Sequence, residues 1–230
     1  MGRVLLTWIV YGEKKNYTET YSYVDGKLKT TIKKYDNSDR ATTTTYSYHN
    51  DGKLAKVLVE KPGNAGQNGQ IEKITFVTET DYTHTGNVIS AAEKRYTKDA
   101  QGNKRDGDTS LTNYTYTFEN ENLIKKTENS TEYNSTTEYT YDGKNNPLFQ
   151  NFKKLIDPDY FNDAKNSKNN ILTRKITTKY NYNNSTIVKE YVYEHTYADN
   201  NYPLTEKVFR KRTENGLEKK ELDLTTEYTY

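Results

Sequence analysis

The chain of 230 residues contains no cysteine. Without thiols it can have no disulfide scaffold, no thiolate metal site and no cysteine nucleophile. Long apolar runs are also missing, because no window approaches the roughly 20 consecutive apolar residues that a membrane-spanning helix needs. These absences exclude a disulfide-stabilised scaffold, a cysteine enzyme and a helical membrane span within this sequence.

An excess of one charge is absent as well. The 34 Lys and Arg residues nearly balance the 32 Asp and Glu residues, which gives a formal net charge of +2. Lys and Glu are interspersed along the chain, whereas a nucleic-acid-binding surface gathers basic residues on one face. The short pairs Lys33-Lys34 and Lys219-Lys220 fit a solvated strand face, so we expect no nucleic-acid partner.

Aliphatic residues are few, and tyrosine takes their place. A low apolar content combined with a high net charge is typical of disorder, but the net charge here is small and the chain has 23 Tyr. Tyrosine can bury a large ring while its hydroxyl reaches water or a partner. The composition therefore predicts a folded protein whose core is built on tyrosine more than on leucine.

One unit recurs along the chain, first as Tyr21-Ser22-Tyr23-Val24-Asp25-Gly26-Lys27-Leu28. It combines a Tyr-x-Tyr strand end, an Asp-Gly pair suited to a tight hairpin turn, and an apolar residue that begins the returning strand. Its irregular spacing excludes a strict solenoid period. The second aromatic residue of the successive variants is Tyr23, Tyr48, Tyr82, Phe118, Tyr141, Tyr182, Tyr197 and Tyr230.

The segments between these turns alternate with a period of two, which predicts strands with one aromatic face and one polar face. Leu222, Leu224 and Tyr228 continue this aromatic face in the last strand. The first strand, 3–11, is apolar on both faces and holds Trp8, so we expect it to be covered on both sides. Asn215-Gly216 predicts a hairpin, and the Gly-containing stretches 62–70 and 98–110 predict surface loops.

The pattern gives about 14 strands in one antiparallel up-and-down meander, and twisted open sheets rarely exceed about ten strands without curling or splitting. We therefore predict an all-β fold over residues 1–230, as a single domain whose sheet curls into an open barrel or roll. A flat sheet, with its middle strands exposed on both faces and stabilised by cross-strand pairs, is the alternative.

The insert at 149–170 breaks the strand pattern. Its partly helical spacing predicts a short helical segment near 152–163, with a helical turn that starts at Pro158. Its large apolar residues need a surface to cover, and the aromatic face of the sheet is the one available. These residues are Phe152, Leu155, Ile156 and Phe161.

Three of these units, 21–28, 46–54 and 139–148, resemble the YD repeats of rearrangement-hotspot (RHS) and teneurin-like proteins. Most of the chain is similar to secreted YD-repeat-like lipoproteins of Bacteroidetes-type bacteria, which are mostly of unknown function. The shared features, in chain order, are Leu6-x-x-Ile9-x-Tyr11, Asn146-Pro147-Leu148-Phe149, Asn169-Asn170-Ile171, Asn201-Tyr202-Pro203 and the closing strand 225–230. The resemblance implies export to the cell envelope, as an outer-membrane lipoprotein or a periplasmic protein, or secretion. It also implies a lipid anchor on a Cys upstream of Gly2.

The sequence shows no catalytic constellation. The three histidines, His49, His84 and His195, have no HxH or HExxH spacing, so we expect no zinc site. The carboxyl groups of Asp157 and Asp159 could serve a glycosidase, but the start of a helical turn explains them better.

Asp106 and Asp108, in a Gly-rich stretch, offer too few oxygen ligands for calcium. We accordingly expect no catalytic residues, no metal and no cofactor, and the binding residues stay unknown. The repeat is interrupted at the insert 151–170 and at Trp8. If the protein has a binding site, we expect it at one of these two places.

Two classes of function follow. The first is an exported, non-enzymatic, structural or ligand-binding module of the cell surface or periplasm, with a carbohydrate or an envelope protein as its partner and a monomeric state. In this class the inward tyrosines either form a cleft or simply fill the core. The second is a glycan-processing hydrolase with a carboxylate pair in the concave face of the sheet.

Overall fold

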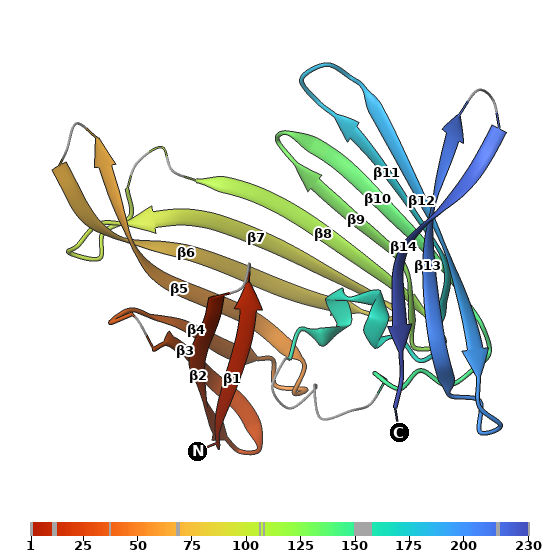
Figure 1. Cartoon of the computed structure of the whole chain (residues 1–230). Helices are drawn as coiled ribbons and strands as arrows, with labels where there is room; N and C mark the ends of the chain where they lie inside the picture. The colour runs from red at the N-terminus through yellow and green to blue at the C-terminus, as the bar shows by residue number, and fades with distance from the viewer. Residues whose placement is uncertain are drawn as a thin grey trace. The chain divides into compact units, whose positions relative to one another are not determined.

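The computed structural model describes residues 2–10, 13–36, 38–67, 70–105, 107, 109–149, 158–214 and 217–229. Strands dominate this part of the chain (Figure 1). They are β1 (Gly2–Val10), β2 (Glu13–Val24), β3 (Lys27–Tyr35), β4 (Ala41–Tyr48), β5 (Leu54–Gln67), β6 (Gln70–Thr85), β7 (Val88–Lys98), β8 (Ser110–Glu119), β9 (Asn122–Ser130), β10 (Tyr133–Tyr141), β11 (Ile171–Tyr180), β12 (Thr186–Tyr197), β13 (Pro203–Glu214) and β14 (Leu217–Glu227). Two 3-10 turns, η1 (Tyr160–Asn162) and η2 (Ala164–Asn166), lie between β10 and β11.

The strands form one 14-stranded sheet in which each strand pairs with its neighbours in sequence. The predicted all-β antiparallel meander is therefore confirmed. Across the described residues the strand order runs linearly from β1 to β14 and the sheet is not closed, as an open barrel or roll requires.

Backbone contacts divide the chain into two compact units. Unit 1 comprises Met1–Thr83 and Ala91–Thr112, and unit 2 comprises His84–Ser90 and Asn113–Tyr230. The single-domain organisation stays a prediction.

Tight turns follow the expected chemistry where the repeat is well kept. Asp25 and Gly26 both have positive φ, at 50° and 74°, which is the backbone of a type I′ hairpin turn. Asn120 and Glu121 make a similar turn between β8 and β9, with φ of 50° and 65°. Local sequence therefore accounts for the Asp25-Gly26 reversal, whereas Glu121 adopts a positive φ that is rare for glutamate.

The prediction of a surface loop at 62–70 is wrong. β5 and β6 continue as a paired hairpin to Gln67 and Gln70, because ladder hydrogen bonds join backbones and need no apolar side chains. Pro62 is tolerated because it lies beyond Glu60, the last β5 residue that pairs with β4. The loop at 98–110 is confirmed, with one bridge between Lys98 and Lys104.

Asp142-Gly143 is also not the hairpin turn that the repeat suggests. The strand that pairs with β10 begins only at Ile171, and the insert occupies the interval, with η1 and η2 as its described helical part. Residues 215 and 216 lie outside the described residues, but Glu214 pairs with Leu217 across them, as a hairpin requires.

Unit 1 has the predicted alternation of faces. Register aligns the buried Tyr46, Val57 and Thr80 across β4, β5 and β6, and it aligns the polar Ser47, Lys56 and Asp81 in the adjacent row, on the opposite face. The buried apolar residues of unit 1 are Tyr17, Tyr21, Leu28, Tyr46, Leu54, Val57, Ile74, Val77, Tyr82 and Ala91.

In unit 2, register aligns Tyr139, Arg174, Tyr191 and Arg210 across β10 to β13. The Arg174 guanidinium lies 4.2 Å from the centre of the Tyr191 ring, a favourable cation–π distance. The buried apolar residues of unit 2 are Tyr116, Leu123, Ala164, Ile171, Tyr193 and Val208. The tyrosine-based core is thus confirmed in both units.

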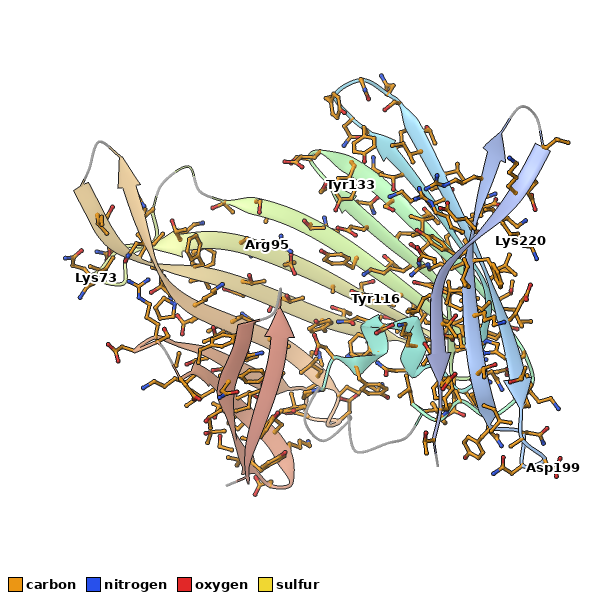
Figure 2. All side chains as sticks on the ribbon, viewed as in Figure 1. Lys73, Arg95, Tyr116, Tyr133, Asp199 and Lys220 are labelled. Carbon is orange, nitrogen blue, oxygen red and sulfur yellow. The ribbon has the colours of Figure 1, made fainter. Side chains whose placement is uncertain are left out.

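The insert packs on the aromatic side of unit 2. The Phe161 ring meets the buried Tyr116 ring edge-on, with centroids 5.8 Å apart, and Figure 2 shows Tyr116 beside the insert. Phe152, Leu155 and Ile156 lie outside the described residues. β1 is described as a strand paired with β2, but the Trp8 side chain is not described.

The last strand departs from the expectation of a buried aromatic face. Leu222 and Leu224 are 54% and 47% exposed. β14 ends the sheet and has a strand neighbour only on its β13 side, so alternation along the strand does not produce burial there.

Candidate ligand groove

A groove of about 560 Å³ lies in unit 1, between β5, β6, β7 and the return at 98–110. The sequence analysis did not identify it. Arg95, labelled in Figure 2 on β7, is one of its lining residues. The lining residues are Asn64, Ala65, Ile74, Phe76, Val77, Thr78, Arg95, Tyr96, Thr97, Arg105 and Ser110.

Among the apolar and aromatic residues that line the groove, Phe76 has the most exposed side chain. Phe76 is 47% exposed, and its ring lies against the backbone of Gly63. A Cβ atom added at Gly63 would fall 2.4 Å from Phe76 Cε2. The glycine therefore leaves the space in which the ring sits.

Strand alternation decides which side chains face the groove. Ile74, Phe76 and Thr78 share one face of β6. Tyr96 points to the other face of the sheet, where its hydroxyl lies 3.4 Å from Glu79 Oε2 and Lys104 Nζ lies 5.2 Å from its ring centre. Phe76 is thus the aromatic residue that presents its ring on the groove side.

A local turn at Asp99 positions the second arginine. Asp99 Oδ1 accepts hydrogen bonds from the backbone N–H groups of Gln101 and Asn103, at 2.9 and 2.8 Å. These backbone donors, Asn103 foremost, hold the pKa of the Asp99 carboxyl below its usual range. The chain then returns beside β7, and the N–H of Arg105 donates to the Thr97 carbonyl at 2.9 Å.

The described residues that line the groove carry positive charge only. They include two arginines and no Asp or Glu. Both arginines contact a carboxylate beside the groove through Nη2. Arg95 lies 2.8 Å from Glu93 Oε1, and Arg105 lies 3.6 Å from Glu72 Oε2.

Each of the three histidines contacts a residue of its own unit. His49 Nε2 is 3.0 Å from the Tyr82 carbonyl, and His195 Nε2 is 2.9 Å from the Ile171 carbonyl. The His84 ring meets Phe161 edge-on. In the described part of the chain, no group of three or more His, Asp or Glu residues is placed to hold a metal ion.

Of the candidate carboxylates, only Asp159 lies in the described part of the chain. Asp159 is the N-cap residue of η1, and its side chain accepts a hydrogen bond from the Asn162 amide at 3.3 Å, not from a backbone N–H. Asp106, Asp108 and Asp157 lie outside the described residues.

The tyrosines of unit 2 under the insert serve packing. Tyr141 donates its hydroxyl hydrogen to the Leu123 carbonyl at 2.6 Å, and burial raises the pKa of its phenol well above the usual value. Tyr193 is 5% exposed. Tyr141 and Tyr193 thus fill the core of unit 2, which is one of the two roles expected for the inward tyrosines.

The sequence offered one weak signal for the groove. The return at 98–110 is a long polar loop, and such loops often carry function. The local sequence does not predict that residues 103–105 fold back beside β7. It also does not predict that Gly63 makes room for the Phe76 ring on the neighbouring strand.

Comparisons with known proteins add little to this geometry. No protein-family model matches the chain, and no curated protein does. One similar solved structure is a porin-like protein from Bacteroides uniformis. It has 13% sequence identity and a TM-score of 0.31, and the match covers 84% of this chain and 93% of that one. A likeness this slight carries no argument about function.

None of the helical segments in the described residues has the length and apolar character to cross a membrane.

Proposed function

We propose that this protein is a non-enzymatic carbohydrate-binding module of the cell surface or periplasm, and that the groove of unit 1 is its binding site. The observation that carries the proposal is the half-exposed Phe76 ring held against Gly63 at the floor of a groove of about 560 Å³. A flat aromatic ring can stack against the C–H face of a sugar, while a few polar groups fix its orientation.

The polar groups around the ring suit a hydroxyl-rich ligand. Thr78, Thr97 and Ser110 contribute hydroxyl groups that can both donate and accept hydrogen bonds, and Asn64 contributes an amide. Such a mixed lining supports the recognition of a sugar over that of a purely apolar ligand.

The charges beside the groove favour binding over hydrolysis. A glycosidase needs two carboxyl groups about 5–10 Å apart on either side of the scissile bond. Two carboxylates of the described residues, Glu72 and Glu93, contact the arginines of the groove. A glycan-processing hydrolase is the alternative function, and the experiment below tests it by looking for hydrolysis of the glycan.

The test is a glycan array probed with the purified chain, followed by titration calorimetry on the best glycan. Phe76→Ala should weaken binding about tenfold, the effect of losing one aromatic stacking contact. Tyr182→Ala is the matched control, because Tyr182 is 79% exposed and lies in unit 2. Hydrolysis of any array glycan would overturn the non-enzymatic assignment, and equal loss in both variants would remove the groove from the proposal.

We also propose that the protein is exported as a monomer and carries the lipid anchor of the YD-repeat-like lipoproteins. The support is the resemblance of the Tyr-x-Tyr and Asp-Gly units. Fatty-acid labelling and fractionation of cells that make the natural protein test the anchor and the location, and sedimentation measures the oligomeric state. A cytoplasmic, unlabelled product would contradict this part of the proposal.

A further inference from the structure

We infer that the groove selects an acidic polysaccharide, whose sugar rings carry carboxylate groups that Arg95 and Arg105 bind. This inference rests on the proposed carbohydrate-binding function and adds the class of sugar. Its starting point is that the described lining of the groove contains two guanidinium groups and no carboxylate.

The guanidinium groups retain capacity for a ligand. A guanidinium carries five N–H donors in a planar fork that matches a carboxylate. The contacts with Glu93 and Glu72 each involve a single Nη2 atom, so neither contact occupies the whole fork.

Arg105 has the weaker of the two contacts. Its Nη2 lies 3.6 Å from Glu72, and the two side chains are 37% and 50% exposed. An ion pair of this kind in water contributes little, because solvent and salt screen it. A sugar carboxylate in the groove, closer and partly desolvated, can replace Glu72 at Arg105.

Arg95 is held in a different way. Glu93 and Arg95 are two residues apart on the same face of β7, and the Glu93 side chain is only 14% exposed. Glu93 Oε1 lies 2.8 Å from Arg95 Nη2 but makes no hydrogen bond of good geometry. The buried carboxylate thus fixes the position of the guanidinium through charge and leaves its directed N–H donors for a ligand.

The two arginines and Phe76 together define the ligand class. Phe76 favours the flat C–H face of a sugar ring, and the arginines favour a carboxylate on that ring or on its neighbour in a chain. A neutral glycan could stack on the Phe76 ring, but it would offer no carboxylate to the arginines, which would keep only their glutamate contacts.

The experiment compares polymers that differ only in charge. Calorimetry measures the binding of the purified chain to polygalacturonate and to fully methyl-esterified polygalacturonate, with alginate and hyaluronate as further acidic probes. We expect at least one acidic polymer to bind, the esterified polymer to bind at least about tenfold more weakly than its acid form, and the acidic affinity to fall as salt rises.

Substitutions of opposite sign sharpen the test. Arg95→Gln and Arg105→Gln should each weaken acidic binding about tenfold, whereas Glu72→Gln should strengthen it because the competing carboxylate is gone. Arg212→Gln is the matched control, since Arg212 pairs with Glu221 at 3.0 Å in unit 2 and is not one of the residues that line the groove. All four side chains are at least one-third exposed, so the variants should fold, and circular dichroism checks that they do.

The outcomes separate this inference from the proposed function. If the acid and ester forms bind equally and Phe76→Ala weakens both, the carbohydrate site stands and the acidic selectivity is wrong. If none of the three acidic polymers binds, the inference is overturned, and the glycan array decides the proposed function independently. If Arg212→Gln matches the groove variants, the effect is non-specific attraction and the inference also fails.

Discussion

Tyr197 donates its phenol hydrogen to Asp142, which lies 55 positions earlier in the chain. Asp142 also accepts hydrogen bonds from the backbone N–H groups of Lys144 and Asn170, at 2.9 and 3.1 Å. One carboxylate therefore joins the end of β10, the residue before β11 and the end of β12, and it holds the C-terminal end of the insert at Asn170.

Replacement of this carboxylate should destabilise unit 2. Asp142→Ala leaves the Tyr197 hydroxyl and two backbone N–H groups without their acceptor in a half-buried position. We expect the free energy of unfolding to fall by about 3 kcal/mol, measured by urea titration with near-ultraviolet circular dichroism.

Asp25→Asn is the control for that substitution. Asp25 occupies an exposed hairpin turn at positive φ, and asparagine tolerates this backbone conformation as well as aspartate does. Its midpoint should match that of the unaltered protein. A similar midpoint for Asp142→Ala would show that the insert is held by other contacts.

The tyrosine core should make the protein sensitive to alkali. Burial raises the pKa of Tyr139 to about 12, whereas an unfolded tyrosine titrates near 10. The unfolded chain then loses its phenol proton at a lower pH than the folded one, so the stabilisation is complete below about pH 10 and is lost as the pH rises toward about 12.

This pH dependence is measured as the urea midpoint at pH 8, 10 and 11 (values chosen to bracket the usual tyrosine pKa of about 10). Tyr139→Phe should flatten the alkaline decline, because phenylalanine has no proton to lose. Tyr182→Phe, at a position that is 79% exposed, should leave it unchanged. A profile that Tyr139→Phe does not alter would assign the alkaline sensitivity to other groups.

Gly63 should matter more for binding than for folding. Gly63→Ala places a Cβ atom 2.4 Å from the Phe76 ring, and the half-exposed ring can swing away at small cost. Alanine is also about 0.5–1 kcal/mol better than glycine inside a strand. We expect little change in the urea midpoint and a loss of glycan affinity like that of Phe76→Ala.

Gly143→Ala provides the comparison for Gly63, because a Cβ atom at Gly143 meets nothing within 4 Å. It should leave both stability and binding as they are. Full glycan affinity in Gly63→Ala would mean that the ring does not form the floor of the site.

The Asp99 turn should control the placement of Arg105. Asp99→Ala removes the acceptor for the N–H groups of Gln101 and Asn103, so the return at 98–110 should open and Arg105 should leave the groove. Hydrogen exchange at the Arg105 amide should speed up, because its bond to Thr97 depends on this turn.

For acidic polymers, Asp99→Ala should reproduce the affinity loss of Arg105→Gln. Asp51→Ala, which removes a comparable side-chain acceptor for the Lys53 N–H in the β4–β5 turn, should leave the affinity unchanged. Unchanged exchange at Arg105 in Asp99→Ala would show that the bridge between Lys98 and Lys104 is sufficient by itself.

Much of the fold followed from local pattern. Alternation with a period of two and Asp-Gly pairs such as Asp25-Gly26 predicted the strands, the meander and the tyrosine-based core. These features depend on backbone preferences and on which face of a strand is apolar, and both can be read from a few neighbouring residues. The same reasoning placed the insert and predicted that Phe161 would cover the aromatic face.

The wrong predictions concern segments whose structure depends on contacts with other parts of the chain and not on their own sequence. Asp142-Gly143 has the sequence of a hairpin turn but does not form one. The Asp142 carboxylate instead accepts hydrogen bonds from the Asn170 backbone N–H and from the Tyr197 hydroxyl. Residues 62–70 look like a loop, yet Pro62–Gln67 pair with the strand that begins at Gln70, because that neighbouring strand satisfies their backbone hydrogen-bonding groups. Leu222 and Leu224 have the period-two spacing of a buried strand face, but they are exposed because β14 is the last strand of the sheet.

The sequence by itself determined the kind of protein this is: an antiparallel meander with tyrosines inside and balanced charges outside. Only the tertiary structure decided where a ligand could bind. The groove needs Gly63 beside the Phe76 ring and Arg105 returned to β7 by the Asp99 turn. Such neighbours are created by strand register and loop closure, which the short-range periodicity of a sequence does not encode.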